Sequence, residues 1–579
     1  MERKLMTGNE AVARGAWEAG AVVAAAYPGT PSTEITDNAA KYPEIYAEWS
    51  PNEKVAFEVA FGAAVAGARA MTAMKHVGVN VAADALFTAA YTGVNGGMTV
   101  VCADDPDMHS SQNEQDTRHY GRAAMLPVLE PSSSQEAKDF CKLAFFLSEN
   151  FDTPVILRVT TRIAHSQSLV ELGERVSVPV KEYKKDAAKY VMSPGFARKR
   201  RLEVQKRMQA LAEFAEESPL NRVEMADASI GIITSGVLYQ YVKEVLPQAS
   251  VLKLGITHPL PRRLIERFAS SVKQLYVVEE LGPFLEDAIK SWGIAVKGQE
   301  LFSPIGEVFA QDIAAALGGV SLPRPLLEND LPARPPLMCA GCPHRGLFYL
   351  LHKHKPVVTG DIGCYTLAAG PPLSAMDTCV CMGSSISVAH GMEKAGHSPQ
   401  KTVAVLGEST FLHSGIHPLI NTVYNQSAVT TIILDNSTTA MTGHQHHPAS
   451  GFNIKGQPAP AVDLPALAAA CGVKHVQVVD PFDLAATENA LKAALQFKGP
   501  SVLITKSPCI LLDKKAQFRP YSVEESCTGC KICLKMGCPA LGLQDGPGKV
   551  KARIEAAQCT GCGLCAAVCP SDSITRRNV

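Results

Sequence analysis

The chain has 579 residues, of which 46% are hydrophobic and 19% charged, and its formal net charge at pH 7 is -1. This length predicts about four domains, each large enough to bury its own core. A nearly neutral charge gives no reason to expect a nucleic acid or an anionic membrane as a partner. The 17 cysteines are more than a disulfide-free cytoplasmic chain needs, unless most of them bind metal.

The amino-terminal segment lacks the apolar core of a signal peptide. The longest apolar stretch, residues 55–74, is interrupted by Glu58 and Arg69, so it does not qualify as a membrane span. We therefore expect a cytoplasmic protein with no membrane partner.

The first domain is predicted over residues 1–168. An apolar strand at residues 21–26 leads into the segment Tyr27-Pro28-Gly29-Thr30-Pro31-Ser32. The prolines and the glycine predict a tight turn, and Ser32 is expected to cap the next helix and leave its N–H groups facing a ligand. An ordinary capping turn fits the same residues.

Glu53 opens a second candidate segment, a helix rich in small residues that contains Gly62. An acid in the first turn of a helix also simply complements the helix dipole, so the residues alone leave both interpretations open. His76 follows the next apolar strand, where it would either contact a substrate or serve as a buried structural histidine.

The middle of the chain is predicted to be structural. Residues 228–321 alternate apolar strands with helices, a pattern typical of a small α/β domain. Residues 169–227 form a charged helical connector, whose buried face is predicted from helical spacing to contain Leu202, Val204, Met208, Leu211 and Phe214.

Residues 336–512 form the next predicted domain, which contains a candidate metal site. Two short apolar runs, typical of buried parallel strands, end in Gly407-Glu408-Ser409 and in Asp435-Asn436-Ser437-Thr438. Because ligands bind at the carboxyl ends of parallel strands, Glu408 and Asn436 are expected to meet there. A carboxylate, an amide and a loop carbonyl are hard ligands that suit Mg²⁺ beside a diphosphate, although Gly-acid-Ser also occurs in ordinary turns.

Two further features of this domain are candidates for ligand binding. The turn Gly383-Ser384-Ser385 leads into a helix and could present N–H groups to a diphosphate. The Cys-x2-Cys pair of Cys339 and Cys342 is compatible with zinc.

Eight cysteines in the tail, residues 513–579, give the most specific signal. Their spacing, with a proline after the last cysteine of each group, is that of a two-cluster bacterial ferredoxin, in which that cysteine binds the other cluster. We expect one [4Fe-4S] cluster on Cys527, Cys530, Cys533 and Cys569, and a second on Cys559, Cys562, Cys565 and Cys538.

The chain as a whole resembles the alpha subunits of indolepyruvate:ferredoxin oxidoreductases, in the thiamine diphosphate-dependent 2-oxoacid:ferredoxin oxidoreductase superfamily. The resemblance rests on the segment around Thr30, on Glu53 with Gly62, on Glu408 with Asn436, and on the cysteine order. It implies a multidomain α/β fold: two doubly wound thiamine diphosphate-binding domains, a domain like the carboxyl-terminal domain of transketolase, and a small two-cluster ferredoxin-like α+β domain. One departure is that Glu408 stands where relatives have an aspartate.

The resemblance also implies residue roles. Glu53 would hydrogen-bond the aminopyrimidine of the cofactor, and Thr30 and His76 would lie near the substrate. The diphosphate would be bound by Gly383, Ser384, Ser385, Gly407 and Ser409, and the Mg²⁺ by Glu408, Asn436 and Thr438. A third [4Fe-4S] cluster would be bound by Cys339, Cys342, Cys364 and Cys509, with Cys379 and Cys381 as rival ligands.

The implied reaction converts an arylpyruvate, CoA and oxidised ferredoxin into aryl-acetyl-CoA, CO₂ and reduced ferredoxin. Such enzymes have a separate small beta subunit, so a hetero-oligomer containing an alpha dimer is expected. Two alternatives stay open: the same reaction on pyruvate or a branched 2-oxoacid, and an iron-sulfur electron relay with a degenerate thiamine site.

Overall fold

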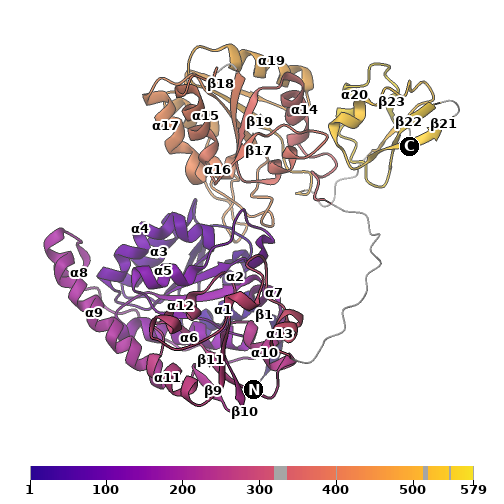
Figure 1. Cartoon of the computed structure of the whole chain (residues 1–579). Coiled ribbons are helices and arrows are strands. Elements are labelled where there is room, and N and C mark those ends of the chain that lie inside the picture. Colours follow the sequence, from indigo (N-terminus) through magenta and orange to yellow (C-terminus); the bar gives the residue numbers. More distant parts are fainter. Residues whose placement is uncertain (1, 319–334, 399–400, 513–518, 547–548, 578–579) are drawn as a thin grey trace. The chain divides into compact units, whose positions relative to one another are not determined.

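The structure is a computed structural model that describes residues 2–318, 335–398, 401–512, 519–546 and 549–577 (Figure 1). The chain divides into two compact units, Met1–Leu327 and Glu328–Val579. Each unit is described by itself. No helix among the described residues is long and apolar enough to cross a membrane.

The first unit is built around a seven-stranded sheet with the order β12-β6-β7-β5-β4-β2-β3. All neighbouring strands are parallel except β12, which pairs antiparallel with β6. The strands are β2 (Val23–Ala26), β3 (Tyr46–Trp49), β4 (Ala70–Lys75), β5 (Met98–Asp104), β6 (Val128–Leu129), β7 (Val155–Thr160) and β12 (Ile256–His258).

Helices cover this sheet, because its strands are apolar on both faces. They are α1 (Gly8–Glu18), α2 (Thr33–Ala39), α3 (Glu53–Val65), α4 (His76–Thr92), α5 (Thr117–Ala124), α6 (Ser134–Phe151) and α7 (Thr161–His165). A separate antiparallel pair joins β1 (Arg3–Thr7) to β8 (Gln167–Glu171).

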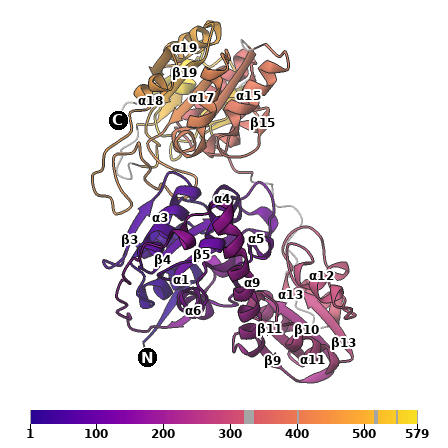
Figure 2. The same cartoon turned by 90° about the vertical axis from the view of Figure 1, so that its left-hand side faces the viewer.

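The connector contains α8 (Ala187–Tyr190) and the long helix α9 (Pro194–Glu217). Val204 and Leu211 are buried as predicted, but Leu202 is 63% exposed, so its place on the buried face was wrong. Arg207 is buried instead, because its guanidinium donates to the carbonyl of Ala90 at the end of α4 (2.6 Å). Helix α9 contacts α4 and α6 on one side and α11 on the other (Figure 2).

The second sheet of this unit has the order β13-β10-β11-β9. Its strands are β9 (Arg222–Glu224), β10 (Asp227–Ser235), β11 (Ala249–Leu254) and β13 (Gln274–Val278), and its helices are α10 (Leu238–Val245), α11 (Arg262–Ser270), α12 (Phe284–Ser291) and α13 (Ala310–Leu317). A buried ion pair, Arg118 to Glu279 at 2.9 Å, joins it to the first sheet. The predicted small α/β domain is therefore tied firmly to its neighbour.

The second unit contains a six-stranded parallel sheet with the order β15-β14-β16-β17-β19-β18. Its strands are β14 (Val357–Gly360), β15 (Thr378–Cys379), β16 (Thr402–Gly407), β17 (Thr430–Asp435), β18 (His475–Val479) and β19 (Ser501–Lys506). The helices are α14 (His344–His354), α15 (Ser384–Lys394), α16 (Glu408–Thr410), α17 (Ile416–Tyr424), α18 (Leu464–Ala470) and α19 (Leu484–Gln496). Strands β16 and β17 are adjacent, parallel and fully buried, which confirms the expected pair.

The tail is a small α+β domain of the same unit. Strand β20 (Tyr521–Val523) pairs with β23 (Ile574–Arg576), and β21 (Leu541–Gly546) pairs with β22 (Lys549–Ile554). Helix α20 (Leu564–Ala567) lies between β22 and β23 in sequence. Its small core includes several of the cysteines. The predicted fold class, α/β with largely parallel sheets and a small α+β tail, is confirmed.

Candidate active site

In the first unit, the predicted site residues follow the carboxyl ends of adjacent parallel strands, where doubly wound sheets bind their ligands. Thr30 follows β2, Glu53 follows β3 and His76 follows β4. The fold therefore brings these three positions to one edge of the sheet.

Glu53 is the first residue of α3, and its side chain is buried, with 4% of the residue exposed. Asn52 caps this helix by accepting from the N–H of Val55 (2.9 Å). The carboxylate lies against Gly78 near the start of α4, where a Cβ would stand 2.7 Å from the Glu53 Oε1. Gly62, which the resemblance paired with Glu53, has no described atom within 4 Å of such a Cβ. The close approach therefore depends on Gly78.

Lys75 is a buried residue of this site that sequence reasoning missed. Its stem lies beside Gly29, and its ammonium donates to the carbonyl of Ser110 (2.9 Å), whose hydroxyl donates to the carbonyl of Thr30 (3.1 Å). Burial lowers the pKa of Lys75 to about 8. The only available signal was a lysine at the end of an otherwise apolar strand.

The structure also shows the local contacts of Ser32 and His76. Ser32 does not cap α2, because its hydroxyl donates to the Gly29 carbonyl within the turn (2.7 Å). His76 is 1% exposed, and its Nε2 lies 3.1 Å from the Asn113 carbonyl while its Nδ1 has no hydrogen-bond partner among the described residues. Burial lowers the pKa of His76, which favours a neutral ring.

In the second unit, Glu408 is 2% exposed and follows β16 directly. Its Oε1 accepts from the N–H groups of Asn436 (3.2 Å) and Thr438 (3.1 Å), both in the loop after β17. Among the described residues, the hydrogen bonds and the ion-pair contact of this carboxylate are all made by Oε1. The donor set, with the second oxygen uncommitted by those contacts, fits a hard divalent ion such as Mg²⁺.

Asn436 links this group to two cysteine-bearing loops. Its carbonyl accepts from the N–H of Cys509 (2.9 Å), and its side-chain Nδ2 lies 3.2 Å from the Nε2 of His344, two residues after Cys342. Burial lowers the pKa of His344 to about 4, so this ring is neutral and accepts from the amide. Asn436 therefore connects the carboxylate of Glu408 with both cysteine loops.

The other predicted diphosphate residues are held in different ways. Gly407 donates its N–H to the Tyr365 hydroxyl (3.0 Å), and Ser409 accepts from the hydroxyl of Thr439 (2.9 Å). In the turn before α15, the N–H groups of Gly383 (3.0 Å) and Ser385 (3.1 Å) donate to buried Asp361. Those two groups are thus engaged inside the protein. Ser384 is half-buried, and its N–H (3.1 Å) and its hydroxyl (2.7 Å) donate to the Cys381 carbonyl.

His447 is a second residue that the sequence did not single out. Its Nδ1 accepts from the N–H of Ala449 (3.2 Å), so in the neutral ring the proton is on Nε2. That Nε2 is 3.3 Å from Oε1 of Glu408, although the alignment is not that of a hydrogen bond. Such contacts often tighten only when a ligand binds. A histidine in a polar loop of three histidines carried no distinguishing signal.

Four thiols of this unit form a group: Cys339, Cys342, Cys364 and Cys509. Burial, together with a smaller effect of nearby thiols of the same group, raises the pKa of Cys342 to about 12 and that of Cys364 to about 11. Burial also raises the pKa of Cys509, with Cys339 among the other causes. For Cys379 the neighbours after burial are Asp361, Thr366 and Cys381 instead. The rival pair thus lies apart from this group, whose four sulfurs fit an iron-sulfur cube.

The surroundings of the tail thiols fit the two predicted groups. After burial, the thiols that raise the pKa of Cys533 belong to Cys527, Cys530 and Cys569. Those that raise the pKa of Cys562 belong to Cys538 and Cys559. The pKa of Cys565 is raised by the other thiols of its own group and, by a smaller effect, by Cys533 of the other group. Each set of four sulfurs would be the donor set of one cluster.

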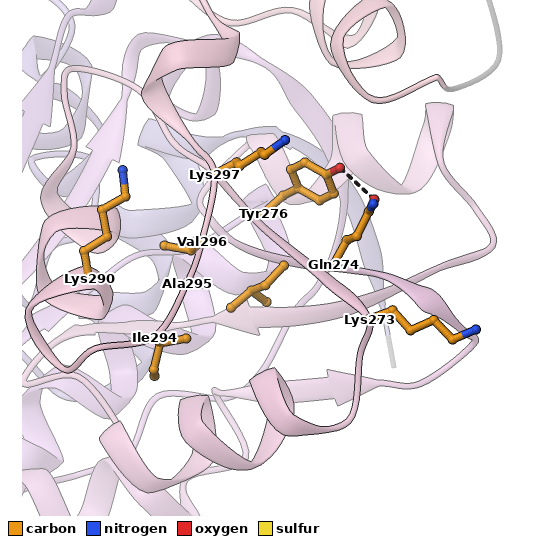
Figure 3. A pocket seen from close by; sticks show the side chains of 9 residues that line it. Lys273, Gln274, Tyr276, Lys290, Ile294, Ala295, Val296 and Lys297 are labelled. Atoms are coloured by element: carbon orange, nitrogen blue, oxygen red, sulfur yellow. Dashed lines mark hydrogen bonds between the residues drawn. The ribbon is translucent and has the colours of Figure 1, made fainter.

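A pocket of about 360 Å³ lies elsewhere in the first unit, along strand β13 (Figure 3). Three lysines surround it: Lys273, Lys290 and Lys297. Lys290 is paired with Glu286, and none of the predicted site residues lines this pocket.

Three family models match the chain. "Pyruvate flavodoxin/ferredoxin oxidoreductase, thiamine diP-bdg" matches residues 14–219, "Thiamine pyrophosphate enzyme, C-terminal TPP binding domain" matches 361–505, and "4Fe-4S dicluster domain" matches 515–573. The indolepyruvate oxidoreductase subunit IorA of Archaeoglobus fulgidus is 44% identical over 99% of this chain and 97% of its own length. The chain belongs to the IorA family. The IorA of Pyrococcus horikoshii is 43% identical over 98% of this chain and 96% of its own length.

As an IorA-family chain, the protein contains two thiamine diphosphate-binding domains and a 4Fe-4S dicluster domain. The 2-oxoglutarate synthase subunit KorA of Archaeoglobus fulgidus is 27% identical over 53% of this chain and 96% of its own length. That relative therefore corresponds to only part of this chain. Cys339, Cys342 and Cys509 lie outside the three matched ranges.

Proposed function

We propose that this chain is the thiamine- and cluster-bearing subunit of an indolepyruvate:ferredoxin oxidoreductase. The enzyme would decarboxylate an arylpyruvate oxidatively, transfer the aryl-acetyl group to CoA and reduce ferredoxin. The relatives that match almost the whole chain are named as subunits of indolepyruvate oxidoreductase, which supports the substrate and the presence of a partner subunit. That partner would be the small beta subunit. A hetero-oligomer with an alpha dimer is part of the same proposal.

In the first unit, Glu53 would hold the aminopyrimidine end of the cofactor. Thiamine diphosphate, when bound, supplies a ring that accepts the electron pair released by decarboxylation. The role of the protein is to hold a carboxylate against that ring in a buried site, and the approach of Glu53 to Gly78 supports this. Thr30, His76 and the ammonium of Lys75 would line the side where the substrate binds.

In the second unit, Glu408, Asn436 and Thr438 would hold Mg²⁺ and through it the diphosphate. Gly407 and Ser409 would lie beside the phosphate oxygens, whereas the N–H groups of the turn at 383–385 are engaged inside the protein. Burial of Glu408 beside two loop N–H groups supports a fixed carboxylate oxygen at this position.

Asn436 carries the proposal, because this one residue contacts the carboxylate at the proposed metal position and two of the three segments that hold the four-thiol group. A third [4Fe-4S] cluster, bound by Cys339, Cys342, Cys364 and Cys509, would therefore lie close to the metal site. Electrons released by the substrate would be transferred to this cluster. An electron relay with a degenerate thiamine site would need none of these contacts. From the third cluster, electrons would pass through the tail to ferredoxin.

The test is anaerobic co-purification of the chain with its small subunit, followed by cofactor analysis and turnover. We expect bound thiamine diphosphate and Mg²⁺, CoA-dependent ferredoxin reduction, and a higher kcat/KM for indolepyruvate than for pyruvate or a branched 2-oxoacid. A preference for another acid would overturn the substrate assignment. Iron without thiamine diphosphate would favour the electron relay.

A further inference from the structure

Arg345 is a buried cation whose hydrogen bonds join two separate loops. It is the second residue of α14 and is 2% exposed. One end of its guanidinium, Nη1, donates to the carbonyls of Met536 (2.8 Å) and Gly537 (2.6 Å) in the tail. The other end, Nη2, donates to the carbonyls of Met338 (2.6 Å) and Cys339 (2.9 Å).

This cation lacks an acidic partner. Among the residues that the structure describes, the hydrogen-bond partners of Arg345 are these four carbonyls, it forms no ion pair with a carboxylate, and its Nε has no hydrogen-bond partner. A buried charge is costly unless an opposite charge compensates it. Carbonyl oxygens offer only partial compensation, so another source of negative charge is required.

Both loops held by this guanidinium carry cysteines of the predicted clusters. Arg345 donates to the carbonyl of Cys339 itself and to that of Gly537, which directly precedes Cys538. The loops at 339–342 and 559–562 also approach each other, since a Cβ on Gly341 would stand 2.1 Å from the Thr560 hydroxyl. Cys339 belongs to the four-thiol group beside Asn436, and Cys538 belongs to the tail group of Cys538, Cys559, Cys562 and Cys565.

A cube bound by four thiolates carries a net negative charge, which becomes larger by one when the cube is reduced. Resting on the proposed function, we propose that Arg345 is the positioning residue between the third cluster and the nearer tail cluster. Its guanidinium holds both cluster loops by their carbonyls and supplies the positive charge that the two anionic clusters share.

This position suits a transfer between the two clusters. When one electron moves, the third cluster is oxidised and the tail cluster is reduced by the same amount, so the summed charge around Arg345 is unchanged. A cation between donor and acceptor therefore raises the reduction potential of both, while the cluster on Cys527, Cys530, Cys533 and Cys569 feels it less. The final acceptor is ferredoxin, as in the proposed reaction.

The experiment is an EPR-monitored redox titration of the complete, cluster-loaded enzyme with three variants. Arg345→Met removes the charge and the hydrogen bonds, and Arg345→Lys keeps the charge. Lys353→Met is the matched control, because it removes one cation from the exposed side of the same helix, where Lys353 pairs with Glu488. Iron content is measured on each protein.

We expect Arg345→Met to lower the midpoint potentials of two of the three clusters and to slow ferredoxin reduction about 10- to 100-fold. Arg345→Lys should shift the potentials less, and Lys353→Met should leave all three unchanged. Three clusters with unshifted potentials in Arg345→Met, or three equal shifts, would overturn the inference alone. An unmodified enzyme with only two clusters, about eight irons, would overturn the third cluster and this role of Arg345 together.

Discussion

At the scale of single residues, the position of Glu53 explains how a carboxylate can be held ready for the aminopyrimidine. It is buried at the start of α3, whereas Glu58 in the same helix has a side chain that is 47% exposed and pairs with Lys54. The resemblance points to Glu53, which is followed nine residues later by Gly62, and not to Glu58. The burial of Glu53 supports its proposed role.

We predict that Glu53→Gln binds thiamine diphosphate and all clusters but decarboxylates about 100- to 10,000-fold more slowly, because an amide cannot exchange the proton that a carboxylate does. The rate of CO₂ release from indolepyruvate measures this. Glu58→Gln is the control and should behave like the unmodified enzyme. If Glu53→Gln retains the full rate, Glu53 does not have this role.

His447 would account for a glutamate at the proposed metal position, where the resemblance expects an aspartate. Glu408 has one more methylene than aspartate, and its Oε1 is surrounded by two N–H groups and by the Nε2 of His447. A metal-binding carboxylate is commonly oriented by such neighbours. These contacts would fix one oxygen and leave the other for the proposed Mg²⁺.

We predict that His447→Phe weakens Mg²⁺ binding about 10- to 100-fold, measured by calorimetry at saturating thiamine diphosphate. His446→Phe, in the same loop but outside the Glu408 contacts, should have no effect. In a Glu408→Asp background the shorter carboxylate should not reach His447, so the second substitution should add little. An equal loss in both backgrounds would mean that His447 only supports the loop.

Residue roles were only partly predictable from the sequence. Glu408 and Asn436 could be paired because parallel strands end at one edge, and that rule needs only the pattern of apolar runs. Lys75, His447 and Arg345 could not be found, because their importance comes from burial and from partners distant in the chain. No local pattern encodes such contacts.

At the scale of elements, the helix start at α4 shapes the site as much as α3 does. The resemblance directed attention to Gly62, which lies within the helix that Glu53 begins. The contact, however, crosses from α3 to Gly78 in α4. A pairing between two helices depends on sheet order, which the sequence predicts less directly than the helices themselves.

We predict that Gly78→Ala lowers the decarboxylation rate about 100-fold, because the new methyl group must displace the Glu53 carboxylate by about an ångström. The protein should still fold, since alanine favours a helix. Gly62→Ala is the control, with open space around its Cβ, and should raise the free energy of unfolding by about 0.5–1 kcal/mol with full activity. Comparable rates in the two variants would contradict the role of Gly78.

At the scale of the whole molecule, the alternation of strands and helices indicated the α/β domains, and the spacing of the eight cysteines predicted the small tail domain. The sequence did not predict that the second sheet would be joined to the first by β12 and by the buried pair of Arg118 and Glu279. It also did not predict that the tail would be held by an arginine from α14. Charged residues are usually expected on the surface, so a buried arginine is not predicted from its type.

The number of clusters that the chain binds is a property of the whole molecule, and substitution of a single cysteine tests it. Cys364→Ser should lower the iron content from about twelve to about eight per chain, because one sulfur of the third group is lost, while Cys379→Ser should leave it unchanged. Iron and acid-labile sulfide analysis measures both. Loss of iron in Cys379→Ser but not in Cys364→Ser would transfer the site to the rival pair.

The central claim is that oxidation of a 2-oxoacid delivers electrons into the clusters of this chain. The most direct measurement is the EPR spectrum of the anaerobic enzyme, with its small subunit, after addition of indolepyruvate alone. The account predicts signals of reduced [4Fe-4S] clusters in the unmodified enzyme and their absence in Glu53→Gln, although dithionite reduces both proteins. Clusters that dithionite reduces but indolepyruvate leaves oxidised in the unmodified enzyme would contradict it.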